Sequence, residues 1–218
     1  MWALILGHCG HNFGFMILLI EMPTFLSTAL HYDMKTNGVL SSLPFVLQAV
    51  GAWVASYVAD KLRKSDKLSI TAIRKIINSI GAFGPAVCLI GVTVSGCQPE
   101  LIVTLLCIAM AVNGCCYAGY NVTHVDMCPE LAGTLYAITN TIANSAGFLG
   151  PMVVGIFTKN GSTLSNWNNV FYSAVGVYVF CGAMFALFGS ADLQQWNTTT
   201  DEAKCKAKKH VVIVKTHL

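Results

Sequence analysis

Charge is the scarcest property of this 218-residue sequence, because only 11% of its residues are Asp, Glu, Lys or Arg while 55% are hydrophobic. The mean hydropathy is +0.61. A soluble domain of this size would carry far more charge, so the composition excludes the ordinary soluble classes. Long apolar runs fill the chain instead. A run of about 18 residues or more is long enough to cross a hydrocarbon core of roughly 30 Å.

The motifs of several protein classes are also missing. No nucleophile–base pair, phosphate-binding loop or metal cluster stands out in the sequence, which argues against an enzyme. No cofactor and no nucleic-acid partner is expected. The paired Asn-Pro-Ala of a water channel and the threefold Pro-x-Asp/Glu-x-x-Lys/Arg repeat of a mitochondrial carrier are absent. The first apolar run has no basic segment before it and is longer than the core of a signal peptide, so no cleavable signal is expected.

The apolar runs predict six membrane-spanning helices, at residues 2–30, 38–59, 70–95, 101–123, 131–158 and 170–189. Each run must be helical, because lipid offers no partner for a free backbone N–H or C=O group. Turn residues such as Gly96 and Pro99 separate the runs. The predicted fold class is therefore an all-α integral membrane protein, with a six-helix bundle over residues 1–196 and a Lys-rich tail at 197–218.

The basic residues predict how these helices sit in the membrane. If the six helices alternate, eleven of the thirteen Lys and Arg residues fall on one side, in the loop and turn after the second run and in the tail. Only Lys35 and Lys159 fall on the other side. The positive-inside rule places the crowded side in the cytoplasm. Both termini are therefore expected to be cytoplasmic.

Glu21 is the only one of ten carboxylates within a predicted span. An acidic residue in the membrane is expensive to bury and suggests a functional site. Two interpretations are open. Glu21 lies near the external end of its helix and simply reaches solvent, or it lines an outward-facing cavity and carries a proton. Pro23 lies two residues later, where it frees a backbone carbonyl and allows a bend.

Other polar residues recur at helical spacing. His8, His11 and Asn12 share one face of the first helix, and amides recur every four residues in the fourth and fifth. In lipid such residues point inward, where they either bond a neighbouring helix or line a water-filled path. No further ligand joins His8 and His11, so no metal site is expected. The candidates for a substrate path are His11, Asn12, Glu21, Asn113, Tyr117, Asn121, Asn140 and Asn144.

Seven stretches lie in the order typical of one transporter family: EMPTF at 21–25, NGVLSSLP at 37–44, ADKLR at 59–63, RKI at 74–76, GYNVTHVDMCP at 119–129, ITNTIA at 138–143 and GPMVVG at 150–155. Over residues 2–196 the chain resembles the second half of a major facilitator superfamily transporter. Within that superfamily it is similar to the anion/phosphate:cation symporter branch, which contains sialin, the vesicular glutamate transporters and the insect inorganic phosphate cotransporters.

This resemblance implies secondary active transport of an organic or inorganic anion (phosphate, a sialate-like solute or another carboxylate), coupled to H⁺ or Na⁺. It implies helices 7–12 of twelve, arranged as a 3+3 inverted repeat in the lipid bilayer, with the amino-terminal six-helix half as the missing partner. The substrate path lies between halves that rock. The membrane is the plasma membrane or an endolysosomal or vesicle membrane. The basic loop matches a superfamily signature that acts as a cytoplasmic ion-pair latch, which makes Asp60, Lys61, Arg63 and Arg74 gate candidates.

The chain departs from the family pattern at three places. The vesicular glutamate branch has Arg at the position of His11, and sialin-like members have Tyr there and at Met16. The usual Asn-His-Leu-Asp run reads THVD at 123–126. The first six helices are also absent, so Met1 is either an internal methionine of a truncated gene model or the start of a short product. The alternative function is therefore a truncated half-protein that does not transport and only associates with a full-length transporter.

Overall fold

The computed structural model describes residues 1–194, and all regular elements within this range are helical. They are α1 (Trp2–Thr28), α2 (Met34–Lys64), α3 (Ile70–Val94), α4 (Pro99–Asn113), the π-helix η1 (Tyr117–Asn121), α5 (Val122–Met127), the 3₁₀-helix η2 (Pro129–Leu131), α6 (Ala132–Ala143), α7 (Ala146–Thr158) and α8 (Leu164–Phe188). Six helical stretches of the described chain are long and apolar enough to cross a membrane. The predicted all-α class with six spanning helices is confirmed. The predicted tail at 197–218 lies outside the described residues.

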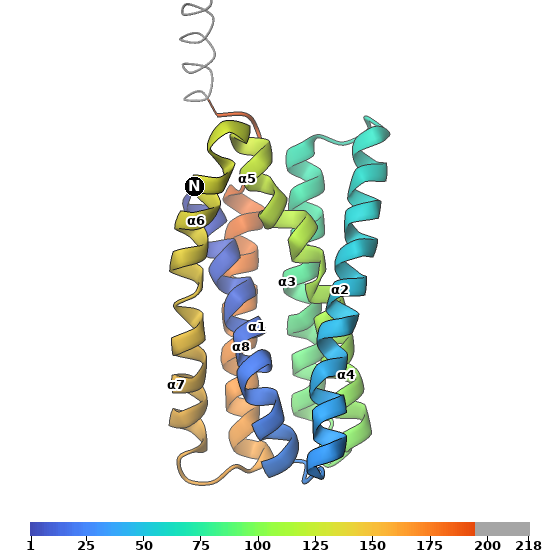
Figure 1. The fold of residues 1–218 in the computed structure, drawn as a ribbon, viewed down its shortest axis with the longest axis vertical. Helices are drawn as coiled ribbons and strands as arrows, with labels where there is room; N and C mark the ends of the chain where they lie inside the picture. Colours follow the sequence, from blue (N-terminus) through green and yellow to red (C-terminus); the bar gives the residue numbers. More distant parts are fainter. Residues whose placement is uncertain (195–218) are drawn as a thin grey trace, which may run out of the picture.

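The helices form one upright bundle that alternates in direction (Figure 1). α3 packs along α8, α1 packs on α8, and α2 and α3 both pack on α4. α1 also contacts α6 and α7 on one side and α2 on the other, so it lies between them (Figure 1). The chain start and the loop at residues 65–69 lie at one end of the bundle, and the turn at 159–163 lies at the other (Figure 1).

α2 is longer than the apolar run that predicted it. The run covers residues 38–59, whereas the helix covers Met34–Lys64. The carboxylate of Asp33 accepts hydrogen bonds from the backbone N–H groups of Lys35 (3.1 Å) and Thr36 (3.2 Å), which fixes the helix start. The hydrogen bonds from Thr36 lower the pKa of Asp33 below its usual value. The cap and the final basic turn are polar, so hydropathy alone could not include them.

α2 and α4 approach each other closely through glycine. A Cβ atom on Gly51 would collide with the backbone carbonyl of Ala111, and one on Gly114 would collide with the backbone of Gln48 and Ala52. Small residues of this kind allow helix backbones to touch within a membrane. The two helices therefore pack backbone to backbone.

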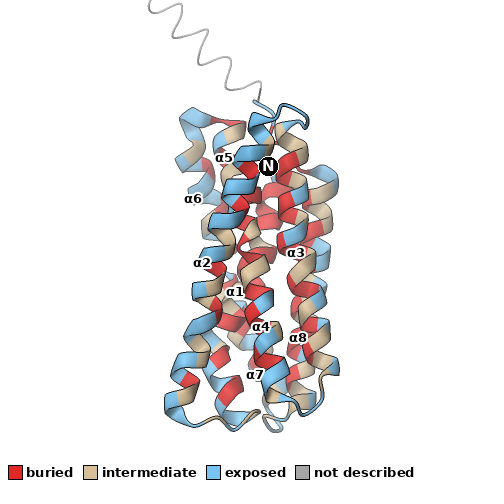
Figure 2. Cartoon of the chain, turned by 90° about the vertical axis from the view of Figure 1, so that its right-hand side faces the viewer, coloured by how far each residue is buried: buried red, intermediate tan, exposed pale blue. Residues whose placement is uncertain are grey.

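The outer face of α2 is apolar and exposed. Trp53 is 73% exposed and Tyr57 68% exposed, and several valines of α2 are also exposed. Figure 2 shows buried residues along the centre of the bundle and exposed ones along α2. Exposed apolar patches of this size mark contact with a membrane or another protein. This face is suited to lipid or to a second transmembrane domain.

Two of the six spans are interrupted. The fourth contains η1, where Gly119 has a non-helical backbone (φ −89°, ψ −109°) and packs so closely on Asn78 of α3 that a Cβ would clash. The fifth is divided between α6 and α7 at Asn144 and Ser145. α7 itself continues through Pro151.

Candidate functional site

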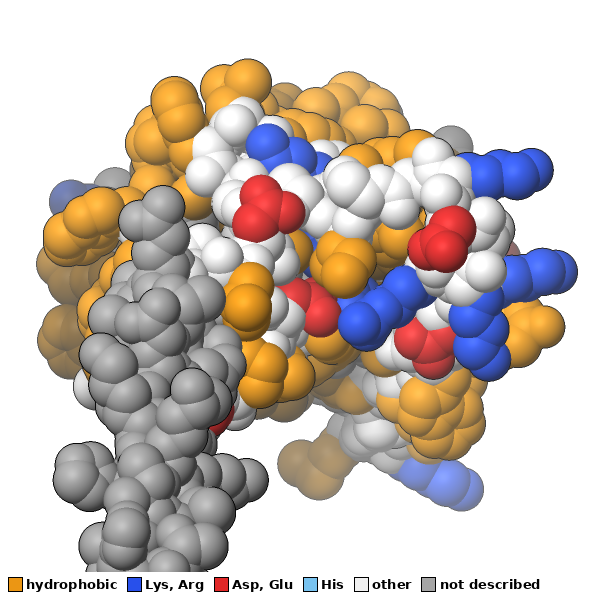
Figure 3. Space-filling view, turned by 90° about the horizontal axis from the view of Figure 1, so that it is seen from above, with side chains coloured by type: hydrophobic (Ala, Val, Ile, Leu, Met, Phe, Trp, Pro, Cys, Tyr) orange, Lys and Arg blue, Asp and Glu red, His pale blue; other side chains and the backbone are white. Residues whose placement is uncertain are grey.

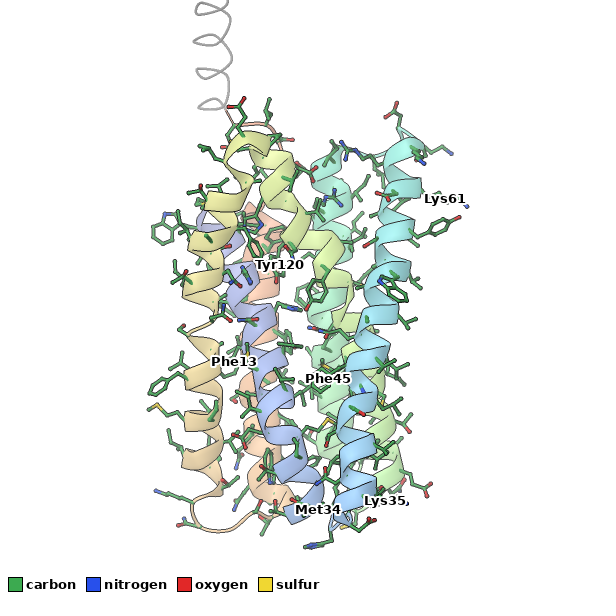
Figure 4. The ribbon with its side chains drawn as sticks, in the orientation of Figure 1. Phe13, Met34, Lys35, Phe45, Lys61 and Tyr120 are labelled. Carbon is green, nitrogen blue, oxygen red and sulfur yellow. The ribbon has the colours of Figure 1, made fainter. Side chains whose placement is uncertain are left out.

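A cluster of histidine and tyrosine rings lies where α1 meets η1, α5 and α6. His8 of α1 stacks near Tyr120 of η1 and Tyr136 of α6, with ring centroids 4.7 and 5.6 Å apart. His124 of α5 meets the ring of Tyr136 edge-on at 5.4 Å. Tyr120 lies in the half of the bundle that carries Lys61 (Figure 4). Four helical segments thus enclose one set of titratable rings.

Thr139 of α6 joins the two histidines. Its Oγ1 lies 3.1 Å from Nδ1 of His8 and 2.8 Å from Nε2 of His124. The other nitrogen of His124, Nδ1, lies 2.9 Å from the backbone carbonyl of Asn121. Thr139 is also within 3.1 Å of the carbonyl of Tyr136, to which it can donate. His8, His124 and Thr139 are all buried, so this network lies away from bulk solvent.

His11 lies one turn further along α1 and lacks a hydrogen bond at one nitrogen. Its side chain is 4% exposed, and its Nδ1 has no partner in the described structure. The ring is parallel to Phe15 (6.0 Å) and meets Tyr117 edge-on (5.3 Å). Buried polar atoms are rarely left unpaired. The Nδ1 atom of His11 is therefore available for a hydrogen bond that the described residues do not supply.

The neighbours of His11 complete a polar strip, defined here as His11, Asn12, Tyr117 and Asn144. Asn12 donates from Nδ2 to Oδ1 of Asn144 at 3.2 Å, which joins α1 to the junction of α6 and α7. Tyr117 and Asn144 are exposed, whereas His11 and Asn12 are buried. The polar strip therefore runs from the interior of the bundle to its surface.

Asn113 has a different environment from the polar strip. It is fully buried at the end of α4. Its Oδ1 accepts from Nε2 of Gln48 at 2.8 Å, and its Nδ2 donates to the hydroxyl of Tyr178 at 3.1 Å. The sequence places Asn113, Tyr117 and Asn121 on one helical face, but η1 intervenes and changes the direction of the side chains. In the described structure Asn113 joins α2, α4 and α8.

The other predicted path residues lie apart. Asn121 and Asn140 are half-buried, and the structure places no side-chain hydrogen bond on either amide group within the described residues. Glu21 is half-buried on α1, about 10 Å from its Thr28 end, and has no hydrogen bond or ion pair to a described residue. These three residues do not join His11 in one cluster.

The four gate candidates divide into one buried and three exposed residues. Arg74 of α3 is buried, and its Nε lies 2.7 Å from Oδ2 of Asp126 on α5. Its Nη1 donates to the carbonyl of Ala118 at 2.9 Å. Arg63 lies 3.9 Å from the same carboxylate, with 56% of its side chain exposed. Asp60 and Lys61 are exposed and make no ion pair with a described residue.

The end of the bundle that carries the loop at residues 65–69 is called the basic end. Figure 3 shows Lys and Arg side chains gathered there, with acidic side chains among them. Lys35 lies at the opposite end of the bundle from Lys61 (Figure 4). Asp126, rather than Asp60, supplies the acidic partner of this end. Hydropathy did not place Asp126 in the fourth helix, because the apolar run ends at 123 whereas the helical stretch extends to Met127.

Sequence reasoning also missed Thr139, Gln48 and Tyr178. A threonine next to the predicted Asn140 carried no signal of its own, since threonine is common in membrane helices. No group of three or more possible ligands that could hold a metal ion lies within residues 1–194.

Comparison with known proteins assigns the family. The family model of the Major Facilitator Superfamily matches residues 1–151. The chain belongs to the Major Facilitator Superfamily, and it is a multi-pass membrane protein of a transporter family rather than an enzyme.

Within that superfamily the relatives fall in the anion:cation symporter branch. The chain is 39% identical to a Drosophila ananassae protein named "Putative inorganic phosphate cotransporter", over 93% of this chain and 43% of the relative. It is 35% identical to human sialin over 90% of this chain and 39% of the relative. It is 30% identical to bovine vesicular glutamate transporter 2 over 94% of this chain and 35% of the relative. The chain thus spans well under half the length of these relatives.

Proposed function

We propose that this chain forms the carboxyl-terminal half of a secondary transporter that moves a small anion together with H⁺ or Na⁺. The observation that carries the proposal is the polar strip, with the unpaired Nδ1 of buried His11 at its inner end. An imidazole N–H, a phenol O–H and two amide NH₂ groups are hydrogen-bond donors. Donors of this kind suit the oxygens of phosphate or a carboxylate. The names of the relatives support the same solute class.

The shape of the bundle supports a second half as partner. The strip reaches the surface through Tyr117 and Asn144, and α1 lies between α6–α7 and α2, which expose apolar residues such as Phe148 and Trp53. A six-helix bundle supplies only one wall of a cavity formed between repeats. The missing wall is the amino-terminal half, and the basic end at residues 60–75 faces the cytoplasm.

Uptake by proteoliposomes tests the proposal. The 218-residue chain alone should take up no phosphate, sialate or glutamate above empty liposomes. The same chain, assembled with the amino-terminal half of the Drosophila relative, should show saturable uptake of at least one of them. His11→Ala should abolish most of that uptake, whereas His31→Ala, at an exposed turn, should not.

Two results would contradict the proposal. Saturable uptake by the isolated chain would mean that six helices are the functional unit. Stable assembly with no uptake of any of the three anions would instead favour the half-protein that associates without transporting.

A further inference from the structure

We infer that His8, Thr139 and His124 form a proton-binding relay that takes up one proton and passes it between α1 and α5. This inference deepens the proposed function, because it names a site for a coupling proton. The three side chains come from three different elements: α1, α6 and α5. The hydroxyl of Thr139 lies between the two rings, at 3.1 Å from His8 Nδ1 and 2.8 Å from His124 Nε2.

The acceptors around the relay fix the position of each proton. The carbonyl of Asn121, 2.9 Å from His124 Nδ1, can only accept, so that nitrogen carries hydrogen. A neutral His124 therefore has a lone pair on Nε2, and the Thr139 hydroxyl must donate to it. The oxygen of Thr139 then accepts from the N–H at His8 Nδ1. Both histidines are consequently in the Nδ1–H form, and Nε2 of His8 is left as a basic nitrogen with no bond to a described residue.

The relay takes up one proton at His8, and the added charge appears on His124. When Nε2 of His8 takes a proton, the Nδ1–H proton of His8 passes to the oxygen of Thr139, and the hydroxyl proton of Thr139 passes to Nε2 of His124. His8 ends neutral as the Nε2–H form, Thr139 keeps one hydroxyl proton, and His124 ends as an imidazolium. His124 then donates through Nδ1 to Asn121 and through Nε2 to Thr139.

The structure also accommodates the transferred proton. In the protonated state Nε2 of His124 donates to the oxygen of Thr139, and the hydroxyl of Thr139 donates to the free Nδ1 of His8. Each polar atom between the two rings therefore keeps a partner. The carbonyl of Tyr136, 3.1 Å from Oγ1 of Thr139, is a further acceptor for the hydroxyl as it turns from one ring to the other.

Titratable side chains of four elements lie around the relay. Tyr120 of η1, Tyr136 of α6 and His11 of α1 face the rings. From α8, Cys181 packs against Gly10, on the turn that follows His8. Asp126, two residues after His124 on α5, forms a buried ion pair with Arg74 of α3. Arg63 adds a weaker, mostly exposed cation.

Nuclear magnetic resonance of the ¹⁵N-histidine-labelled chain in lipid nanodiscs tests the relay without any transport assay. At neutral pH the imidazole signals should show the Nδ1–H form for both His8 and His124. Histidine in water favours the Nε2–H form, so two Nδ1–H rings are a specific signature. On acidification both rings should change together in a shared transition, the first protonation step, because that proton belongs to the coupled pair rather than to either ring.

Three variants separate the relay from general packing. Thr139→Val removes the hydroxyl at nearly constant shape, so His8 should lose its Nδ1–H preference while His124 keeps it through Asn121, and the shared transition should be lost. Thr139→Ser should retain both features. Thr141→Val removes an exposed hydroxyl two residues along the same helix and should change nothing.

Either of two results overturns the relay. One is an Nε2–H form for His124 in the unmodified chain. The other is an unchanged His8 signal and shared transition in Thr139→Val, with the His11 and His31 signals showing an intact fold. These measurements need no solute, so a negative result would contradict the relay but not the proposed anion transport. A negative uptake assay would likewise contradict the transport proposal but not the relay.

Discussion

Glu21 is an acidic side chain on an otherwise apolar helix, and its surroundings favour access to water. It is half-buried, has no ion pair to a described residue and lies about 10 Å from the end of α1. Pro23 follows it, and the carbonyl of Pro23 accepts a hydrogen bond from Nδ2 of Asn37 on α2 at 2.8 Å. The contact ties α1 to α2 beside the carboxylate. An acid at this position is suited to exchange protons with water at the Thr28 end of α1.

Glu21→Gln tests that role in a protein completed by its amino-terminal half. We expect the external-pH dependence of uptake to shift while surface expression stays intact, because the amide cannot bind the proton. Glu100→Gln, at an exposed position in the first turn of α4, is the matched control and should leave the profile unchanged. An unaltered profile in Glu21→Gln would show that Glu21 is only an interfacial residue.

Asp33 gives a prediction about pH and local stability. The pKa of Asp33 is lowered in the folded chain by its hydrogen bonds to Thr36. A lowered pKa stabilises the folded state above the pKa of the unfolded chain, about 3.9 for aspartate. That stabilisation is lost as the pH falls through the lower, folded-state pKa. Amide hydrogen exchange at Lys35 and Thr36 should therefore accelerate, relative to the rest of α2, as the sample is acidified through that range.

Asp33→Asn is the control for this effect. Asparagine can still cap the helix but does not titrate, so the local acceleration should vanish. If exchange in the variant accelerates as in the unmodified chain, the carboxylate of Asp33 is not its cause.

The contact of α3 with α5 is held by a buried ion pair. Arg74 and Asp126 are each 7% exposed at the side chain and 2.7 Å apart. Removing one partner of a buried ion pair leaves an uncompensated charge, which typically costs about 3–5 kcal/mol. The exposed Arg63 contributes less, since solvent screens it.

Asp126→Asn should therefore lower the free energy of unfolding by about 3 kcal/mol, measured by denaturant titration in micelles. Asp60→Asn, on the same end but exposed, should have little effect. The pair Arg74→Met with Asp126→Leu should recover much of the loss, because no buried charge remains. Equal behaviour of Asp126→Asn and Asp60→Asn would contradict the importance of the pair.

Hydropathy predicts the six spanning helices because the bilayer requires long apolar runs, and the spacing of His8 and His11 places both against Tyr120, which they contact. Hydropathy does not predict η1, because that turn depends on Gly119 meeting Asn78, a contact between residues far apart in the chain. The relay through Thr139 could not be predicted from the sequence either, because its geometry depends on how α5 and α6 pack against α1. Predicting the Arg74–Asp126 pair would have required knowing where the fourth helix ends.

The bundle exposes opposite ends with different charge, and this difference predicts its orientation. The basic loop at 60–69 lies at one end, and Lys35 and the turn at 159–163 lie at the other (Figures 1 and 4). In a cysteine-free background, Thr163→Cys should react with an impermeant reagent added outside intact cells, because the positive-inside rule places this turn outside. Ser65→Cys should react only after the membrane is permeabilised. Labelling of both positions from outside would contradict the topology.

Gly119 divides the fourth span into two parts with separate anchors. The lower part is fixed through Asn113 to Gln48 and Tyr178, whereas the upper part carries His124 and Asp126 two residues apart on one short helix. A tilt of the upper part about Gly119 would change the distance from Asp126 to Arg74 and the distance from His124 to Thr139 together. We therefore expect a movement that breaks the Arg74–Asp126 ion pair to alter the proton-binding relay as well.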